Sequence, residues 1–194
     1  MQINSDWQNE GGIMKGIVFS EFLDMVDEKF SIEMSERLVD EVKPPSGGAY
    51  TTVGTYDSQE IVVLVAKLSE ITSISVPDLL KTFGRHLLTR FTEIFPEFFE
   101  GTTSTLDFLP MVESYVHLEV KKLYSDAELP SFTCVSPYPG RLEMTYRSAR
   151  NLPDLAEGLI LGTADHFNER VEVKRESISE DPSAELFIIT KLQG

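Results

Sequence analysis

Residues 132–147, FTCVSPYPGRLEMTYR, contain two short runs rich in aromatic and β-branched residues, separated by Tyr138-Pro139-Gly140. Runs of this composition around a Pro-Gly turn predict a β-hairpin. The chain before this stretch has the apolar spacing of helices, and the chain after it consists mostly of predicted strands. The hairpin therefore marks the place where a helical part of the chain gives way to a sheet.

The helical part is predicted from apolar spacing and from capping residues. Apolar residues recur at helical spacing from Met14 to about Phe30, and a second helix over 32–42 stops at two prolines. Asp57 followed by Glu60 resembles a capping box that opens the helix containing IVVLVAKLSEI. These patterns predict at least three helices in the first third of the chain.

Two longer helices are predicted before the hairpin. Pro77 is suited to the first turn of the helix PDLLKTFGRHLLTRFTEI. Another helix covers 105–124, with Pro110 as a kink or a late start. After the hairpin, LPDLAEGLILGTADHF predicts a helix, and VEVKRESI and ELFIITKL predict two more strands. The expected class is α+β: an N-terminal helical part, then a mostly antiparallel sheet with one helix among its strands.

The charge of the chain limits its partners. It has 194 residues and a formal net charge of −15, from 17 basic and 32 acidic residues. This balance argues against binding to nucleic acids or to anionic membranes, which both need a basic surface. The longest apolar run, IVVLVA, is far shorter than the ~20 residues of a membrane-spanning helix. No nucleic-acid or membrane partner is expected.

The single cysteine, Cys134, rules out an internal disulfide and a cysteine-rich zinc site, and it fits a cytoplasmic location. Residues 1–13 are polar and lack the pattern of a secretory signal, so we interpret them as an N-terminal extension. The functional domain is expected to span residues 14–194.

Polar side chains gather in MTYRSARNLPD, residues 144–154. If this stretch is a strand, Tyr146, Ser148 and Arg150 lie on one face. A phenol, an alcohol and a guanidinium are donors suited to carboxylates or phosphates. An exposed edge strand with ordinary polar residues is an equally good interpretation at this point.

His117 lies in SYVHLEVKKLY, at the border of an apolar helical stripe. From this segment alone it is either a half-buried structural histidine or an axial ligand for iron. No nucleophile elbow, zinc-protease motif or glycine-rich phosphate loop accompanies it. A catalytic constellation is therefore not expected.

Several blocks occur here in one order: MKGIVFSEFLDMV, HLEVKKLY, ELPSF, Tyr-x-Ser-x-Arg and AEGLILGTADHF. Together they resemble the heme-nitric oxide/oxygen-binding family, H-NOX, in its bacterial stand-alone type. The resemblance implies heme b held between the helical part and the sheet. It implies that His117 is the proximal iron ligand, that Tyr146, Ser148 and Arg150 clamp the heme propionates, and that Pro130 presses on the macrocycle.

The resemblance also implies which gas is bound. Oxygen-binding members place a tyrosine, an indole and an amide over the distal face of the heme. The matching positions here are Leu155, Phe22 and Leu87, all apolar, and Val18 is placed among the heme contacts. We therefore expect nitric oxide and carbon monoxide to bind and oxygen to be excluded. His86, beside Leu87, is either turned away or a distal donor or second ligand.

The family implies a switch rather than an enzyme. Nitric oxide weakens the bond opposite to it, His117 leaves the iron, and the helix that carries His117 shifts. The expected partner is a histidine kinase or a cyclic-di-GMP enzyme. Two other hypotheses stay open, a heme enzyme of peroxidase type with His86 as its acid–base group and a heme-free interaction scaffold.

Overall fold

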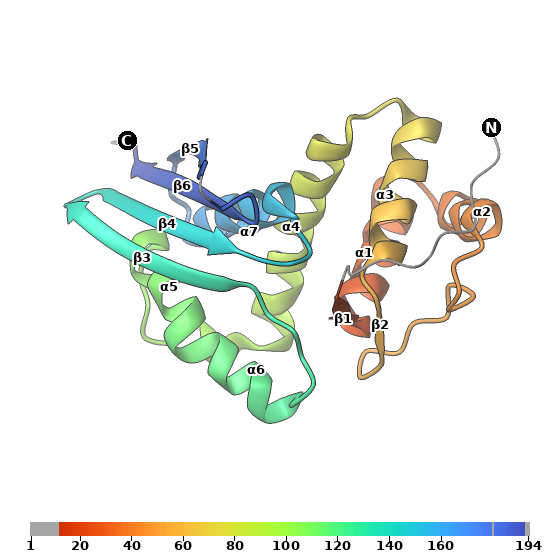
Figure 1. The fold of residues 1–194 in the computed structure, drawn as a ribbon, viewed down its shortest axis with the longest axis horizontal. Coiled ribbons are helices and arrows are strands. Elements are labelled where there is room, and N and C mark those ends of the chain that lie inside the picture. Colours follow the sequence, from red (N-terminus) through yellow and green to blue (C-terminus); the bar gives the residue numbers. More distant parts are fainter. Residues whose placement is uncertain (1–11, 180, 193–194) are drawn as a thin grey trace. The chain divides into compact units, whose positions relative to one another are not determined.

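The computed structural model describes residues 12–179 and 181–192, which belong to two compact units that divide between Ser73 and Ile74. The N-terminal unit is mainly helical, and the C-terminal unit combines helices with an antiparallel sheet (Figure 1). The predicted α+β class is therefore confirmed. Within the predicted extension, residues 1–11 lie outside the described part of the chain.

In the N-terminal unit, one short strand precedes the first helix and another precedes the third. Two strands pair in antiparallel orientation, with Met14 opposite Tyr56. The described elements are β1 Ile13–Lys15, α1 Gly16–Lys29, α2 Ile32–Val42, β2 Thr55–Asp57 and α3 Gln59–Thr72.

The first helix begins two residues later than predicted because its start is tied to a distant loop. The Gly16 N–H donates to the Gly54 carbonyl oxygen at 2.8 Å. A Cβ atom on Gly16 would lie 1.9 Å from the Thr51 carbonyl oxygen, so only glycine fits there. Neither contact is visible in the apolar spacing, which predicted a helix from Met14.

The predicted capping box is wrong. Asp57 ends β2, and its Oδ1 accepts a hydrogen bond from the Gln59 N–H at 2.9 Å. Glu60 is buried, and its Oε2 accepts from the hydroxyls of Ser46 at 2.5 Å and Tyr50 at 2.8 Å. The glutamate therefore accepts hydrogen bonds from loop residues in the interior and does not cap the start of its own helix.

The C-terminal unit contains a four-stranded antiparallel sheet in the order β3-β4-β6-β5. The predicted hairpin, the first-turn Pro77 and the two later strands are confirmed. Its described elements are α4 Val76–Ile94, the 3₁₀ turn η1 Pro96–Phe98, α5 Thr105–Met111, the π-turn η2 Val112–Val116, α6 His117–Leu123, β3 Ser131–Tyr138, β4 Arg141–Arg147, α7 Pro153–His166, β5 Val171–Ser177 and β6 Ala184–Lys191.

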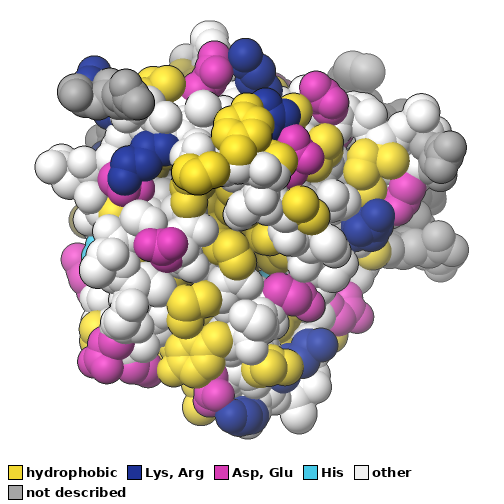
Figure 2. Space-filling view, turned by 90° about the vertical axis from the view of Figure 1, so that its left-hand side faces the viewer, with side chains coloured by type: hydrophobic (Ala, Val, Ile, Leu, Met, Phe, Trp, Pro, Cys, Tyr) yellow, Lys and Arg dark blue, Asp and Glu magenta, His cyan; other side chains and the backbone are white. Residues whose placement is uncertain are grey.

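The inner face of the sheet forms the core of this unit. Side chains alternate along β4, so that Leu142, Met144 and Tyr146 are buried while their neighbours are not. They pack with Phe187 on β6 and with residues of α5 and α7. The edge strand β3 is more exposed, and the side of the molecule that holds the hairpin has hydrophobic side chains between charged ones (Figure 2).

The predicted helix over 105–124 is one helical path with a widened turn in its middle. Pro110 lies inside α5 and has no N–H to donate to the preceding turn. The π-turn η2 comes directly after it, and the His117 N–H donates to the carbonyl oxygen of Val112, five residues earlier. Single π-turns of this kind are frequent at functional sites.

Helices α4 and α7 approach each other closely because glycines line their contact. A Cβ atom on Gly84 would lie 2.5 Å from the Leu155 carbonyl oxygen. One on Gly158 would lie 2.4 Å from the Lys81 carbonyl oxygen. Gly162 is less tightly enclosed, since its nearest neighbour is Leu88 Cβ at 3.0 Å.

The different spacing at Gly158 and Gly162 predicts different losses of stability when each is replaced by alanine. Gly158→Ala forces two backbones apart, and overpacking of that kind costs about 1–3 kcal/mol, of which the better helix propensity of alanine offsets at most about 1 kcal/mol. Gly162→Ala meets Leu88 Cβ at 3.0 Å and Arg85 Cα at 3.1 Å, contacts that a shift of a few tenths of an ångström relieves, so its effect should stay within about 1 kcal/mol. Urea unfolding of both variants checks the order. Equal stabilities would show that the close approach at Gly158 does not constrain the helices.

Candidate functional site

His117 is the first residue of α6 and is mostly buried, with 13% of its side chain exposed. Its Nδ1 lies 3.2 Å from Oε2 of Glu113, one turn earlier in the helix. Its ring centroid is 5.5 Å from that of Phe132 on β3. With Nδ1 occupied by the carboxylate, Nε2 is the ring nitrogen that remains for a metal ion.

The electrostatic surroundings favour the form of this ring that binds metals. Burial lowers the pKa of His117, the charges of Lys121 and Arg150 act in the same direction, and Glu113 opposes them. The net effect is a lowered pKa, which keeps the imidazole neutral at pH 7. A neutral imidazole has a lone pair to give to a metal.

Tyr146 on β4 extends the contact between His117 and Phe132 further into the sheet. Its ring is 5.8 Å from Phe132 and 6.3 Å from Phe187, so aromatic rings continue from His117 across β3 and β4 to β6. Its hydroxyl oxygen accepts a hydrogen bond from the Leu152 N–H at 3.1 Å, just before α7. The same hydroxyl carries a proton that it can donate to a ligand oxygen.

Ser148 and Arg150 do not continue the strand, and the prediction of a shared strand face is wrong for them. Strand β4 ends at Arg147, and in the turn after it Ser148 Oγ accepts from the Arg150 N–H at 3.2 Å. The side chain of Arg150 reaches back, and its Nη1 donates to the Glu128 carbonyl oxygen at 2.7 Å. The three predicted donors therefore come from the end of a strand and from the turn after it.

Arg150 is a partly buried cation close to His117. Burial lowers the pKa of its guanidinium, while the neighbouring Tyr146 and Glu128 raise it. A desolvated guanidinium gains from an anionic ligand. The donors at this end of β4 therefore suit a carboxylate ligand.

The predicted apolar residues lie on three different helices. Leu87 on α4 and Leu155 on α7 are both buried, on the two helices that meet at Gly84. Val18 and Phe22 lie on α1 in the N-terminal unit, where Phe22 is buried and Val18 is half-buried. Their contacts with a cofactor remain predictions.

Three further residues considered from the sequence lie in the C-terminal unit. Pro130 is half-buried and directly precedes β3. His86 is half-buried on α4, with its Nε2 in the interior. Burial raises the pKa of the Cys134 thiol on β3 to about 11, as expected of an unreactive cysteine.

Glu113 and Phe132 are contacts of His117 that the sequence did not assign. Glu113 stands four residues before the histidine, and helical spacing places it beside the ring. Nothing in the sequence connects Phe132 to this helix. Its place is set by the pairing of β3 with β4, where Phe132 is opposite Tyr146.

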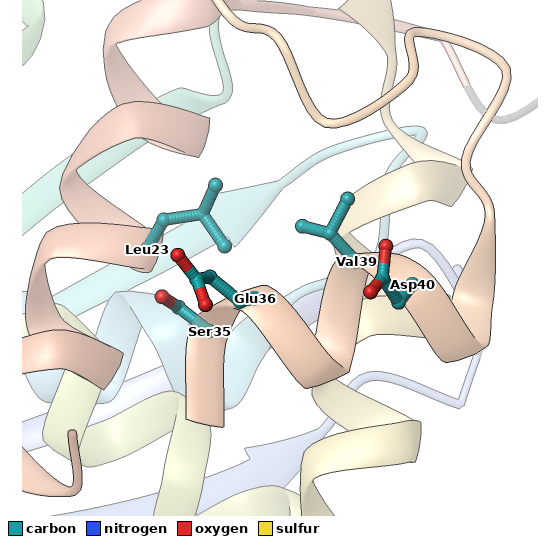
Figure 3. A pocket seen from close by; sticks show the side chains of 5 residues that line it. All are labelled: Leu23, Ser35, Glu36, Val39 and Asp40. Atoms are coloured by element: carbon teal, nitrogen blue, oxygen red, sulfur yellow. The ribbon is translucent and has the colours of Figure 1, made fainter. Parts of the chain in front are cut away.

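A pocket of about 400 Å³ lies in the N-terminal unit, between α1 and α2. Leu23 contributes from α1, and Ser35, Glu36, Val39 and Asp40 contribute from α2 (Figure 3). It is open to solvent, and its two carboxylates are exposed. None of the predicted site residues lines it.

Among the described residues, no group of three or more His, Cys, Asp or Glu side chains is arranged to hold a metal ion. A single imidazole suits a metal whose other ligands come from a macrocycle. The imidazole at His117 and the anion donors at the end of β4 therefore fit the heme predicted from the sequence. No helix in the part of the chain that the structure describes is long and apolar enough to cross a membrane.

Comparison with known proteins gives the same family. A family model described as Haem-NO-binding matches residues 15–175. The unliganded Fe(II) H-NOX protein from K. algicida is 36% identical, with a TM-score of 0.86 over 93% of this chain and 98% of that chain. The IWP-051-bound H-NOX from Shewanella woodyi, in the Fe(II)CO state, is 35% identical, with a TM-score of 0.79 over 92% and 95%.

A more distant structure shares the fold. An H-NOX protein from S. oneidensis in the Fe(II)NO state is 23% identical, with a TM-score of 0.85 over 93% of this chain and all of that chain. No curated protein matches the chain.

The hydrogen bond from the Leu152 N–H to the Tyr146 hydroxyl is expected to contribute to stability. Tyr146→Phe removes the acceptor of the Leu152 N–H, and an unsatisfied buried N–H costs about 1–3 kcal/mol. Tyr138→Phe on the exposed part of β3 is the matched control and should change stability by less than about 0.5 kcal/mol. Chemical unfolding measures both. Equal small effects would mean that the bond to Leu152 contributes nothing.

Proposed function

Because the chain belongs to the Haem-NO-binding family, H-NOX, whose members are heme-binding gas sensors rather than enzymes, we propose that it is a nitric oxide sensor with His117 as its iron ligand. The observation that carries this proposal is the mostly buried imidazole of His117, whose Nδ1 is occupied by Glu113. The cofactor of the family is heme b, which supplies a ferrous iron that binds small gas molecules. The predicted domain, residues 14–194, is proposed as the sensor.

The residues around His117 support this assignment of the heme. Nε2 is the atom left to bind iron, and a lowered pKa keeps the ring neutral. Tyr146, Ser148 and Arg150 bring donors to the end of β4, where the propionates are proposed to bind. We further propose that Pro130, just before β3, contacts the macrocycle.

Gas selectivity is proposed from the apolar residues on α4 and α7. Bound oxygen carries partial negative charge and needs a hydrogen-bond donor, whereas nitric oxide and carbon monoxide depend on one far less. Leu87 and Leu155 are buried and offer no donor. We therefore propose that the protein binds nitric oxide and carbon monoxide and excludes oxygen, with Val18 and Phe22 as further predicted contacts.

Signalling is proposed to begin with the release of His117. This residue is continuous with the π-turn and packs on Phe132, so a change at its ring reaches both α6 and β3. A changed surface would then be recognised by a partner, for which a histidine kinase or a cyclic-di-GMP enzyme is the family-based prediction. A cytoplasmic location also remains a prediction.

The iron ligand is tested by replacing it. His117→Ala should remove the histidine-ligated ferrous spectrum, and added imidazole should restore it, because the cavity left by the side chain accepts the free ring. His166→Ala, which alters an exposed histidine at the end of α7, is the control and should leave the spectrum unchanged. An unchanged histidine-ligated spectrum in His117→Ala would overturn the proposal.

Selectivity is tested by adding a donor at Leu155. Leu155→Tyr places a hydroxyl at the position of the tyrosine in oxygen-binding members and should give a stable oxygen complex. Leu159→Tyr, one turn later on α7 and only half-buried, is the control and should not. Absorption spectra of the reduced proteins in air distinguish these outcomes. Stable oxygen binding by the unaltered protein would contradict the proposed exclusion.

A further inference from the structure

Glu113 makes contacts that the heme assignment does not use. It lies in the π-turn η2, four residues before His117. Its Oε2 is 3.2 Å from His117 Nδ1 and 3.1 Å from the backbone nitrogen of Phe132. One carboxylate oxygen therefore meets donors from the helix and from the first strand of the sheet.

The contact with Phe132 places the carboxylate at the edge of the sheet. Strand β3 is an edge strand, and the Phe132 N–H points away from β4 toward Glu113. In an antiparallel pair without mutual hydrogen bonds the side chains come closer together, which agrees with the 5.8 Å between the rings of Phe132 and Tyr146. Glu113 thus takes the place that a neighbouring strand would have for this amide.

The contact with His117 has a chemical consequence for a metal ligand. A metal-binding histidine commonly donates its second ring N–H to a carboxylate, which fixes the orientation of the ring and makes the bound nitrogen a stronger donor. We propose that Glu113 is a positioning residue for the iron ligand: it aims Nε2 of His117, strengthens its bond to iron and joins the ring to β3. This inference rests on the proposed iron-ligand role of His117.

Glu113 couples His117 to β3 because its Oε2 contacts both the ring of His117 and the backbone nitrogen of Phe132. While Glu113 holds both the Nδ1–H of His117 and the Phe132 N–H, the ring and the strand edge move together. A displacement of the His117 ring would therefore change the bond that Glu113 makes with β3. The π-turn supplies the backbone freedom for this movement, since it already departs from regular helix geometry.

The effect on the bond is tested by resonance Raman spectroscopy of the ferrous protein. Glu113→Gln keeps an oxygen that can accept but removes the charge, so the iron–histidine stretching frequency should fall, and heme affinity should drop about 10–100-fold. Glu119→Gln is the control, because Glu119 lies on α6 and pairs with Lys122 instead. An iron–histidine frequency in Glu113→Gln equal to that of the unaltered protein would overturn the inference.

The link to β3 is tested without reliance on the heme. Glu113→Ala should speed amide exchange at Phe132 about 10-fold or more, since the N–H loses its acceptor, while Glu113→Gln should change it less. Unchanged exchange in Glu113→Ala would refute the link. Failure of the His117→Ala test instead would refute the iron-ligand role and leave the exchange result standing, so the two failures are distinguishable.

Discussion

The C-terminal unit depends on the backbone contact between α4 and α7. Gly84 and Gly158 remove the side chains that would hold these helices apart, so carbonyl oxygens of one helix face Cα atoms of the other. This approach brings Leu87 and Leu155, which carry the proposed selectivity, onto neighbouring helices. Helix α7 then packs Ala156 and Ile160 against the sheet, which joins the helices to the strand that leads to the anion donors.

The second constraint lies in the helical path from Thr105 to Leu123. Pro110 cannot donate to the preceding turn, and the π-turn after α5 shifts the phase of the helix just before His117. The result is a helix that presents an imidazole, and the carboxylate beside it, to the first strand of the sheet. Rings of Phe132 and Tyr146 continue this contact to the end of β4. A change at the histidine therefore has a packed route into the sheet.

Much of this arrangement is readable from the sequence because it depends on local patterns. The hairpin over 132–147 and the first-turn Pro77 each reflect neighbouring residues, and each is confirmed. The misses involve contacts from far along the chain. Gly16 is fixed by a loop near residue 51, and Glu60 bonds to Ser46 instead of capping its helix. The spacing of apolar residues along the chain does not predict such contacts.

The donors near the site show a different limit, which is local. Periodicity placed Ser148 and Arg150 on one strand, but a hydrogen bond within the turn after β4 holds them.

The central claim, that His117 binds iron and leaves it when nitric oxide arrives, is tested most directly by electron paramagnetic resonance of the ferrous protein with nitric oxide. We predict hyperfine splitting from the nitric oxide nitrogen alone. A further splitting from an imidazole nitrogen would show that His117 stays bound and would contradict the account.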